Sequence, residues 1–313
     1  MALTGKSPLI VILGPTAVGK TSRAVELAQA LSGEIVNADS RQVYRGMDIG
    51  TAKPAPAQLA QVPHHLIDIL NPDETLSLAQ YQALARAAIA DIHQRGRLPL
   101  LVGGTGQYIT GLIEGWTTPG VAPNPRLRAE LEAFAAAHSS AALHARLRQH
   151  DAAAADSIDH RNVRRVVRAL EVCIETGRPF SQQQRKQPPP YRVRQYGLTM
   201  DRERLYAQAD QRLADMLARG FLDEVQHLLA MGYTRSLPAL SALGYAQLAQ
   251  HLTGDVPLET ALTAIRRATR AFIRRQYTWF RGHDTGIIWL DAETLDTTAL
   301  VKAAEDWLLK QTE

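Results

Sequence analysis

The sequence contains a single cysteine, Cys173, among 313 residues. One thiol cannot form an intramolecular disulfide or a cysteine-rich zinc site, so neither kind of cross-link stabilises this chain. The cysteine content gives no sign of adaptation to an oxidising compartment. Such staples are also unnecessary, because a chain of this length can bury a large apolar core.

Long apolar runs are missing from the beginning of the sequence. The longest early run, residues 9–13, has five residues. A secretory signal needs a longer apolar region, and a membrane span needs roughly 20 apolar residues. We therefore expect a soluble, cytoplasmic protein that does not enter a membrane. Hydrophobic residues make up 45 % of the chain and charged residues 21 %, which is typical of globular domains.

Short apolar runs alternate with helical patterns over the first hundred or so residues. Strands are predicted at residues 8–13, 34–38 and 98–102, and helices at residues 21–31 and 77–94. Ser77 and Gln80 have the spacing of a capping box, and Gly96 follows the end of the second helix. Strands that alternate with helices indicate a parallel α/β sheet.

This alternation stops at residues 115–125, which read GWTTPGVAPNP and are typical of a linker. Residues 126–177 show only helical patterns rich in Ala, Arg and Glu. Strand patterns return at residues 195–199 and 286–290, and helical patterns at residues 202–231 and 257–281. We predict an α/β domain of residues 1–120 and 193–313, interrupted by an all-helical insertion domain of residues 121–192.

Positive charge is concentrated in the predicted insertion. The formal net charge is +4, but residues 121–195 hold 13 Lys and Arg against 7 Asp and Glu. The rest of the chain holds 22 basic and 24 acidic residues. A local basic surface suits a polyanionic partner, although a solvated helical face has the same composition.

Residues 14–21 read GPTAVGKT and fit the phosphate-loop pattern G-x-x-x-x-G-K-[ST]. The motif consists of Gly14, Pro15, Thr16, Ala17, Val18, Gly19, Lys20 and Thr21. Glycines let backbone N–H groups surround phosphate oxygens, and the following helix adds its positive end. Lys20 supplies a charge, and the Thr21 hydroxyl can ligate Mg²⁺. The motif predicts a P-loop NTPase-like parallel sheet flanked by helices and a phosphate or diphosphate ligand, without identifying that ligand as ATP.

Asp39 follows the second predicted strand, so it should lie near the phosphate loop. Ligands of open α/β sheets bind beyond the carboxyl ends of the strands. Asp39 could hold Mg²⁺ through water, act as a general base, or simply stabilise a turn. Asp68 and Asp291 also end apolar stretches, so the identity of a second metal-binding acid stays open. A glycine-rich turn at residues 103–106 reaches the same edge of the sheet.

Two helical segments carry clusters of arginine. Arg161, Arg164, Arg165 and Arg168 lie within eight residues. The second cluster consists of Arg266, Arg267, Arg270, Arg274, Arg275 and Arg281, interleaved with the aromatic residues Tyr277, Trp279 and Phe280. Arginines bind phosphates, and flat rings can stack on bases. The alternative is a helix with an aromatic core face and a solvated charged face.

Three classes of function use these features differently. A P-loop small-molecule kinase would use the basic insertion as a lid over nucleotide phosphates. A P-loop enzyme that acts on a nucleic acid would use both arginine clusters, and the amount and spread of charge favour this class. A non-catalytic RNA-binding module would leave the phosphate loop and Asp39 without a role.

The order of motifs resembles that of tRNA dimethylallyltransferases, also called tRNA isopentenyltransferases, nearly from end to end. The most specific segment is DSRQVYRGMDIGTAKP, residues 39–54. It is followed by PHHLID (63–68), LLVGGTGQY (100–108), RRVVRALEV (164–172) and RRQYTWFR (274–281). Departures are small: Val18 replaces a common serine, Gln107 a common leucine, and SALGY (241–245) a usual Ile- or Val-Gly-Tyr.

The resemblance implies transfer of a dimethylallyl group from dimethylallyl diphosphate to N6 of adenosine 37 of tRNA, beside the anticodon. The phosphate loop would hold the donor diphosphate, with Mg²⁺ on Thr21 as the cofactor. Asp39 would accept a proton from the attacking amine, and Thr105 would lie near the base. The sequence does not determine the oligomeric state; we expect no obligate protein partner and take a monomer as the default.

The resemblance also assigns binding residues. Arg212 would join the phosphate loop at the diphosphate. Close to it, Ala214 stands where the family often has aspartate. The tRNA contacts would come from Asp39, Ser40, Arg41 and Gln42 at the flipped base, from Arg164, Arg165 and Arg168 in the insertion, and from Arg274, Arg275 and Gln276 in the α/β domain.

Overall fold

A computed structural model describes residues 6–117, 119–183, 185–187, 191–284 and 286–310. The chain forms two units. The α/β unit comprises Met1–Ile113 and Pro189–Glu313, and the helical unit comprises Glu114–Pro188. Each boundary lies a few residues before the one expected from the linker and proline signals.

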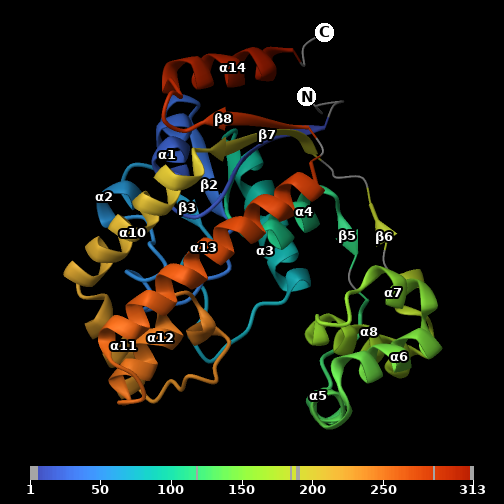
Figure 1. Cartoon of the computed structure of the whole chain (residues 1–313). Coiled ribbons are helices and arrows are strands. Elements are labelled where there is room, and N and C mark those ends of the chain that lie inside the picture. The colour runs from blue at the N-terminus through green and yellow to red at the C-terminus, as the bar shows by residue number, and fades with distance from the viewer. Residues whose placement is uncertain (1–5, 118, 184, 188–190, 285, 311–313) are drawn as a thin grey trace. The chain divides into compact units, whose positions relative to one another are not determined.

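The α/β unit is built on a six-stranded parallel sheet in the order β3-β2-β4-β1-β7-β8 (Figure 1). The strands are β1 (Ser7–Leu13), β2 (Gly33–Asn37), β3 (His64–His65), β4 (Leu98–Gly103), β7 (Tyr191–Thr199) and β8 (Ile287–Asp291). Leu13 lies beside Gly103 of β4 and Gly197 of β7, so these three strands reach the same level of the sheet. The predicted parallel α/β fold is confirmed.

Strand β7 begins four residues earlier than the apolar pattern predicts. Arg192 and Arg194 interrupt that pattern, since both stand on one face of the strand. Their guanidinium groups lie 4.0 Å and 5.5 Å from the centre of the Trp307 ring of α14 (Thr297–Leu309). Stacking on an aromatic ring allows these two charged residues to lie in a strand. The composition of this segment alone does not predict that strand.

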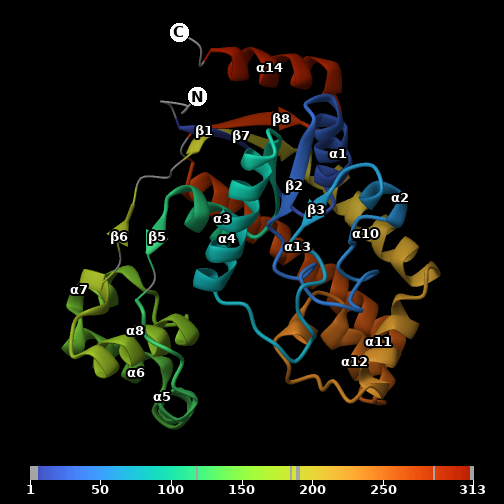
Figure 2. The ribbon, with the colours of Figure 1, turned by 180° about the vertical axis from the view of Figure 1, so that it is seen from behind.

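Helices cover both faces of the sheet (Figures 1 and 2). One face packs on α1 (Lys20–Ala30), α10 (Arg202–Ala218) and α14, and the other on α3 (Leu78–Gln94) and α4 (Gly106–Ile113). Alternate residues of β1 divide between the two cores: Ile10 and Ile12 enter the first, and Leu9 and Val11 the second. This two-sided burial explains the continuous apolar runs of the sequence.

A third core lies under the segment of residues 39–54, which we name the DSRQ segment. Its apolar side chains pack on α11 (Phe221–Ala230), the short helix η1 (Ala239–Ser241), α12 (Tyr245–Leu252) and the first half of α13 (Leu258–Gly282). The helical pattern of residues 202–231 forms two helices, because Gly220 adopts φ +94° between α10 and α11. Despite the 25 residues of α13, no helix in the described part of the chain is long and apolar enough to cross a membrane.

The helical unit has a core of its own, which Leu143, Leu147, Val166 and Leu170 help to form. Its helices are α5 (Pro125–His138), α6 (Ser140–His150), α7 (Ala152–Ser157), α8 (Val163–Thr176) and α9 (Phe180–Gln183). The expectation that it is all-helical needs one correction, because β5 (Trp116–Thr117) pairs antiparallel with β6 (Arg185–Lys186). Two-residue strands are too short to leave a periodic signal in the sequence.

A buried carboxylate joins α5 and its N-cap to α8 in the helical unit. The fully buried Glu171 of α8 accepts hydrogen bonds from Arg128 (2.7 and 2.8 Å), from Arg168 (2.5 Å) and from the backbone N–H of Asn124 (2.7 Å). Burial opposes ionisation of this carboxyl, but the hydrogen bonds outweigh it and lower its pKa to about 2.

This pairing predicts a pH-dependent contribution to stability. We expect Glu171→Gln to lower the free energy of unfolding by roughly 3 kcal/mol at pH 7, because the ionised form is the one that the arginines stabilise. The difference in free energy of unfolding between the two proteins should have its full size above the ordinary carboxyl pKa. It should vanish as the pH falls towards about 2, where protonated Glu171 resembles glutamine. Urea unfolding of both proteins between pH 7 and pH 3 measures it, and a cost independent of pH would contradict it.

Candidate functional site

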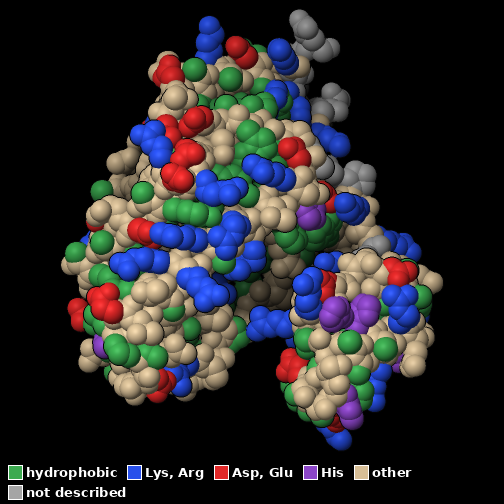
Figure 3. Space-filling model, in the orientation of Figure 1, with side chains coloured by type: hydrophobic (Ala, Val, Ile, Leu, Met, Phe, Trp, Pro, Cys, Tyr) green, Lys and Arg blue, Asp and Glu red, His purple; other side chains and the backbone are tan. Residues whose placement is uncertain are grey.

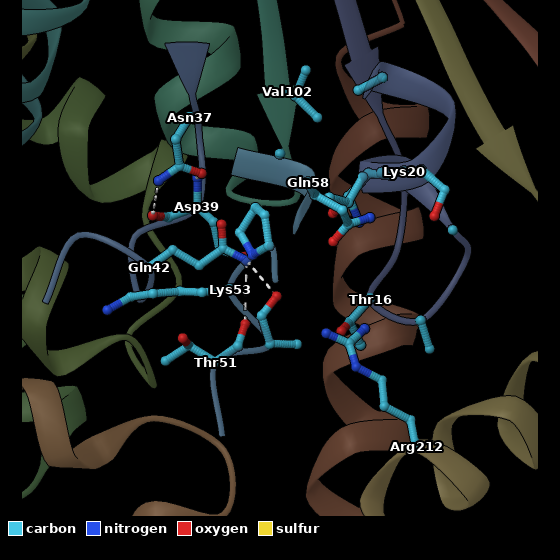
Figure 4. A pocket seen from close by; sticks show the side chains of 18 of the residues that line it. Thr16, Lys20, Asn37, Asp39, Gln42, Thr51, Lys53, Gln58, Val102 and Arg212 are labelled. Atoms are coloured by element: carbon cyan, nitrogen blue, oxygen red, sulfur yellow. Dashed lines mark hydrogen bonds between the residues drawn. The ribbon is translucent and has the colours of Figure 1, made fainter. Parts of the chain in front are cut away.

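A pocket of about 400 Å³ opens where the loops that follow β1, β2 and β4 meet (Figure 4). This volume is typical of small-ligand sites. Residues singled out from the sequence that line it are Thr16, Ala17, Gly19, Lys20, Thr21, Asp39, Gln42, Arg212 and Gln276. In Figure 4, Lys20 and Arg212 lie across the pocket from Gln42 and Lys53.

The phosphate loop turns sharply between β1 and α1. Gly14 has φ +144°, and a Cβ atom there would lie 2.6 Å from the carbonyl oxygen of Leu198. Gly19 has φ +90° immediately before α1, and Ala17 adopts the left-handed φ of +68°. The loop therefore requires glycine at both signature positions, one for close approach and one for backbone conformation.

The cations of the pocket, Lys20 and Arg212, are half-buried. Lys20 Nζ donates to the carbonyl oxygen of Pro15 at 2.6 Å. Burial lowers the pKa of Lys20 to about 8; nearby Asp39 opposes this shift and Arg212 adds to it. Burial also lowers the pKa of Arg212, which projects from α10. Two desolvated cations beside one carboxylate create a pocket that attracts an anion.

Asp39 is fixed at the point where β2 ends. Its Oδ1 accepts from the backbone N–H of Arg41 at 2.8 Å, and its own N–H donates to Asn37 Oδ1 at 3.1 Å. The Asn37 amide also donates to the carbonyl oxygen of Leu66 at 3.0 Å, which ties β2 to the chain after β3. The carboxylate thus lines the pocket in a position set by the backbone.

Thr105 and Ser40 lie against each other beside Asp39. Thr105 Oγ1 accepts from the backbone N–H of Ser40 at 2.9 Å and donates to Ser40 Oγ at 3.2 Å. The backbone N–H of Thr105 donates to the carbonyl oxygen of Ala38 at 3.1 Å. The loop after β4 is therefore bonded to the loop after β2.

Gln42 and Arg41 both hold backbone carbonyls. Gln42 Nε2 donates to the carbonyl oxygens of Ala52 (3.1 Å) and Thr51 (3.3 Å), as the dashed lines in Figure 4 show. The Arg41 guanidinium donates to Pro238 O at 2.7 Å and to Ser241 Oγ at 3.2 Å. These contacts fold the DSRQ segment on itself and attach it to η1.

The arginines of α13 lie on the surface, whereas Gln276 is buried. Figure 3 shows Lys and Arg side chains gathered over α13, and Arg274 and Arg275 are both exposed. The Gln276 side chain is 5 % exposed; it accepts from Thr16 N–H and donates to Gly104 O, both at 2.9 Å. The aromatic residues of this helix pack inward: Phe280 is buried, and Trp279 Nε1 donates to Thr110 Oγ1 at 3.0 Å.

The three arginines of α8 occupy different environments. Arg164 and Arg165 are exposed. Arg168 donates to the buried Glu171 and to the carbonyl oxygen of Val121 at 3.0 Å, so its guanidinium is engaged within the helical unit.

Sequence reasoning assigned no role to several pocket residues, among them Lys53, His64 and Asp215. Lys53 Nζ donates to the carbonyl oxygen of Tyr44 (2.5 Å), to Asp48 (2.6 Å) and to Asp68. The only feature of the sequence that pointed to a role for Lys53 was its position in the DSRQ segment, which resembles the family.

The donors in the pocket suit a hard cation. The Thr21 hydroxyl and the Asp39 carboxylate supply oxygen ligands of the kind that Mg²⁺ prefers, and a bound phosphate would supply the others. Of the two further acids considered, Asp68 is paired with Lys53, and Asp291 ends the edge strand β8. No group of three His, Cys, Asp or Glu side chains in the described ranges is arranged as a metal site.

A parallel sheet with a phosphate loop and a desolvated, cation-rich pocket defines a P-loop-type α/β protein. A family model described as IPP transferase matches residues 42–283, and one described as isopentenyl transferase matches residues 7–71. The chain belongs to the IPP transferase family. It is 56 % identical over 274 residues to a tRNA dimethylallyltransferase of Roseiflexus sp., covering 88 % of this chain and 90 % of that protein.

Other relatives cover nearly the whole chain. A tRNA dimethylallyltransferase of Chloroflexus aurantiacus is 56 % identical over 90 % of this chain and 95 % of its own length. The crystal structure of the tRNA isopentenylpyrophosphate transferase of Bacillus halodurans matches with a TM-score of 0.72 and 40 % identity over 98 % of this chain and 97 % of that one. A eukaryotic dimethylallyltransferase described as acting on tRNA matches with a TM-score of 0.82 and 25 % identity over 97 % and 80 % of the two chains.

The pKa of Lys20 predicts how anion binding depends on pH. Wild-type protein should bind inorganic pyrophosphate more tightly than Lys20→Met, and this advantage should fall roughly tenfold between pH 7 and pH 9 as the ammonium loses its proton. The ionisation of pyrophosphate affects both proteins equally, so the ratio of their dissociation constants isolates Lys20. Calorimetric titration measures that ratio, and a ratio that is constant with pH would contradict the assignment.

Proposed function

We propose that this protein transfers a dimethylallyl group from dimethylallyl diphosphate to N6 of adenosine 37 of tRNA, releasing diphosphate. The observation that carries this proposal is that one pocket holds both an anion cradle, with Lys20 and Thr21, and a backbone-fixed carboxylate, Asp39. Relatives named tRNA dimethylallyltransferase extend over most of the chain, which supports the choice of substrates.

The donor diphosphate would lie in the phosphate loop. Breaking the allylic C–O bond leaves its electron pair on the diphosphate, so negative charge grows there in the transition state. Lys20, Arg212 and the first N–H groups of α1 line or point into this region and would stabilise that charge. Thr21 would hold Mg²⁺, which supplies further neutralisation of the diphosphate when bound.

The acceptor adenine would approach Asp39 from the DSRQ segment. Its N6 forms the new C–N bond with the allylic carbon, and the N6 proton passes to the Asp39 carboxylate. A stacked base cannot reach a pocket, so the nucleotide must leave the anticodon stack. Ser40 and Thr105, which are bonded to each other, and Gln42, which is held by residues 51 and 52, would surround the base.

The RNA backbone would bind to exposed arginines. Arg164 and Arg165 of the helical unit and Arg274 and Arg275 of α13 are exposed and able to contact phosphates. Arg41 and Gln276 have side chains engaged with backbone groups and would order the site around the RNA. We also propose that the active form is a monomer.

A transfer assay tests the proposal. Purified protein, Mg²⁺ and unmodified tRNA are incubated with either dimethylallyl diphosphate or ATP, and digested nucleosides are analysed by mass spectrometry. A dimethylallyl increment on adenosine that needs the prenyl donor is expected. ATP turnover without a modified nucleoside would instead favour a kinase, and tRNA binding without any chemistry would favour a binding module.

Removal of the proposed general base should affect turnover more than binding. We expect Asp39→Asn to lower kcat by about 10²- to 10⁴-fold, the range typical of a general base, while dissociation constants for tRNA and pyrophosphate stay close to wild type. Single-turnover kinetics and titrations measure both quantities. A kcat close to wild type would remove Asp39 from the proton transfer.

The arginines of α8 should separate into two kinds. Replacing Arg164 and Arg165 with alanine should weaken tRNA binding and reduce the slope of log K against log salt by about 1 for each phosphate that the variant no longer neutralises. Arg168→Ala should mainly destabilise the helical unit, because Glu171 is then left without one of its charged partners in the interior. Filter binding across a salt series and urea unfolding distinguish the two effects. Equal salt slopes in all variants would contradict the division.

A further inference from the structure

The first turn of α11 carries a carboxylate that accepts four hydrogen bonds. Glu224 Oε2 accepts from the backbone N–H groups of Asp48 (2.9 Å) and Ile49 (2.7 Å). Its Oε1 accepts from the N–H of Gly50 (3.1 Å) and from the hydroxyl of Tyr245 (2.6 Å). Three consecutive N–H groups of the DSRQ segment therefore converge on one side chain that is 174 or more residues away in sequence.

The packing around this carboxylate leaves little freedom. Gly50 lies against two rings, and a Cβ atom there would be 2.1 Å from Phe221 and 2.6 Å from Tyr245. The two rings meet edge to face with centroids 5.0 Å apart. Burial and the adjacent Glu224 raise the pKa of Tyr245, so its hydroxyl remains a donor. We name Glu224, Tyr245 and the N–H groups of residues 48–50 the Glu224 clamp; its contacts are packed rather than loosely held at the surface.

The clamped residues lead directly to the pocket. Thr51 and Ala52 follow Gly50, and their carbonyl oxygens are the acceptors for the Gln42 side-chain amide. Gln42 lines the pocket together with Asp39, whereas the residues that line it do not include Glu224. Any displacement of residues 48–50 therefore moves the carbonyl groups that orient Gln42.

We propose that Glu224 is a positioning residue, which acts through residues 48–52 to hold the Gln42 amide in place for the acceptor base. This inference rests on the proposed prenyl transfer to tRNA, because Gln42 belongs to its acceptor side. Glu224→Gln keeps the size of the side chain but replaces one acceptor oxygen by an NH₂ group, which faces N–H donors. At least one of the clamped groups then loses its partner, and the segment shifts.

The experiment compares Glu224→Gln with a matched control, Asp223→Asn, which removes the neighbouring exposed acid of the same helical turn. Measured for each are kcat, KM for tRNA, the dissociation constant of pyrophosphate and the melting temperature. We expect Glu224→Gln to lower kcat/KM for tRNA between about 10- and 100-fold, as misplaced site residues do. Pyrophosphate binding should stay within about twofold of wild type, because the phosphate loop is not part of the clamp. The control should match wild type.

A double-mutant cycle with Gln42→Ala tests the route. If Glu224 acts through Gln42, adding Glu224→Gln to Gln42→Ala lowers kcat/KM little further. Fully additive losses would overturn the route through Gln42. A lower melting temperature with unchanged kcat/KM in Glu224→Gln would make the clamp merely structural and overturn the proposal. Wild-type protein that transfers no prenyl group would instead overturn the proposed function itself.

Discussion

The pocket depends on one buried amide, the side chain of Gln276. Its oxygen accepts from Thr16 in the loop after β1, and its nitrogen donates to Gly104 in the loop after β4. These strands are neighbours in the sheet, but their loops could diverge where the strand pairing ends. Only a side chain with both a donor and an acceptor can join an N–H to a carbonyl, so a carboxylate of the same shape would leave one group unpaired. The amide also ties α13 to the phosphate loop.

The two ends of the pocket rest on different cores. The phosphate loop continues β1 and is held by the sheet, so its geometry follows from strand pairing and from Gly14 and Gly19. The DSRQ segment follows the end of β2, is not part of the sheet, and packs on α11 and α12. Its shape therefore depends on side-chain contacts. Arg41 and Lys53 of the segment itself donate to backbone carbonyls, and Glu224 reaches the segment from α11. A reaction between a diphosphate and a large RNA suits this division, with a rigid donor loop and a separately supported acceptor side.

The fold and the phosphate loop could be predicted because their signals are local. A glycine, a lysine or a buried strand acts within a few residues of its own position, and the motif of residues 14–21 contains every group that it needs. Lys53 and Glu224 form hydrogen bonds with groups of an irregular loop, and Glu224 does so over a long distance in sequence. Neither contact follows a helix or strand periodicity, so the sequence alone does not predict it. Arg168 illustrates the same limit. It is indistinguishable from Arg164 and Arg165 in sequence, and only the burial of Glu171 separates its role from theirs.

The charges of the pocket link the two halves of the proposed reaction. The Asp39 carboxylate attracts both Lys20 and Arg212, and burial lowers the pKa of each of these cations. A diphosphate in the phosphate loop, as proposed above, would be a further anionic partner for both cations. A donor diphosphate would therefore share its cations with the proposed general base, so the two halves of the proposed reaction would meet at Lys20 and Arg212.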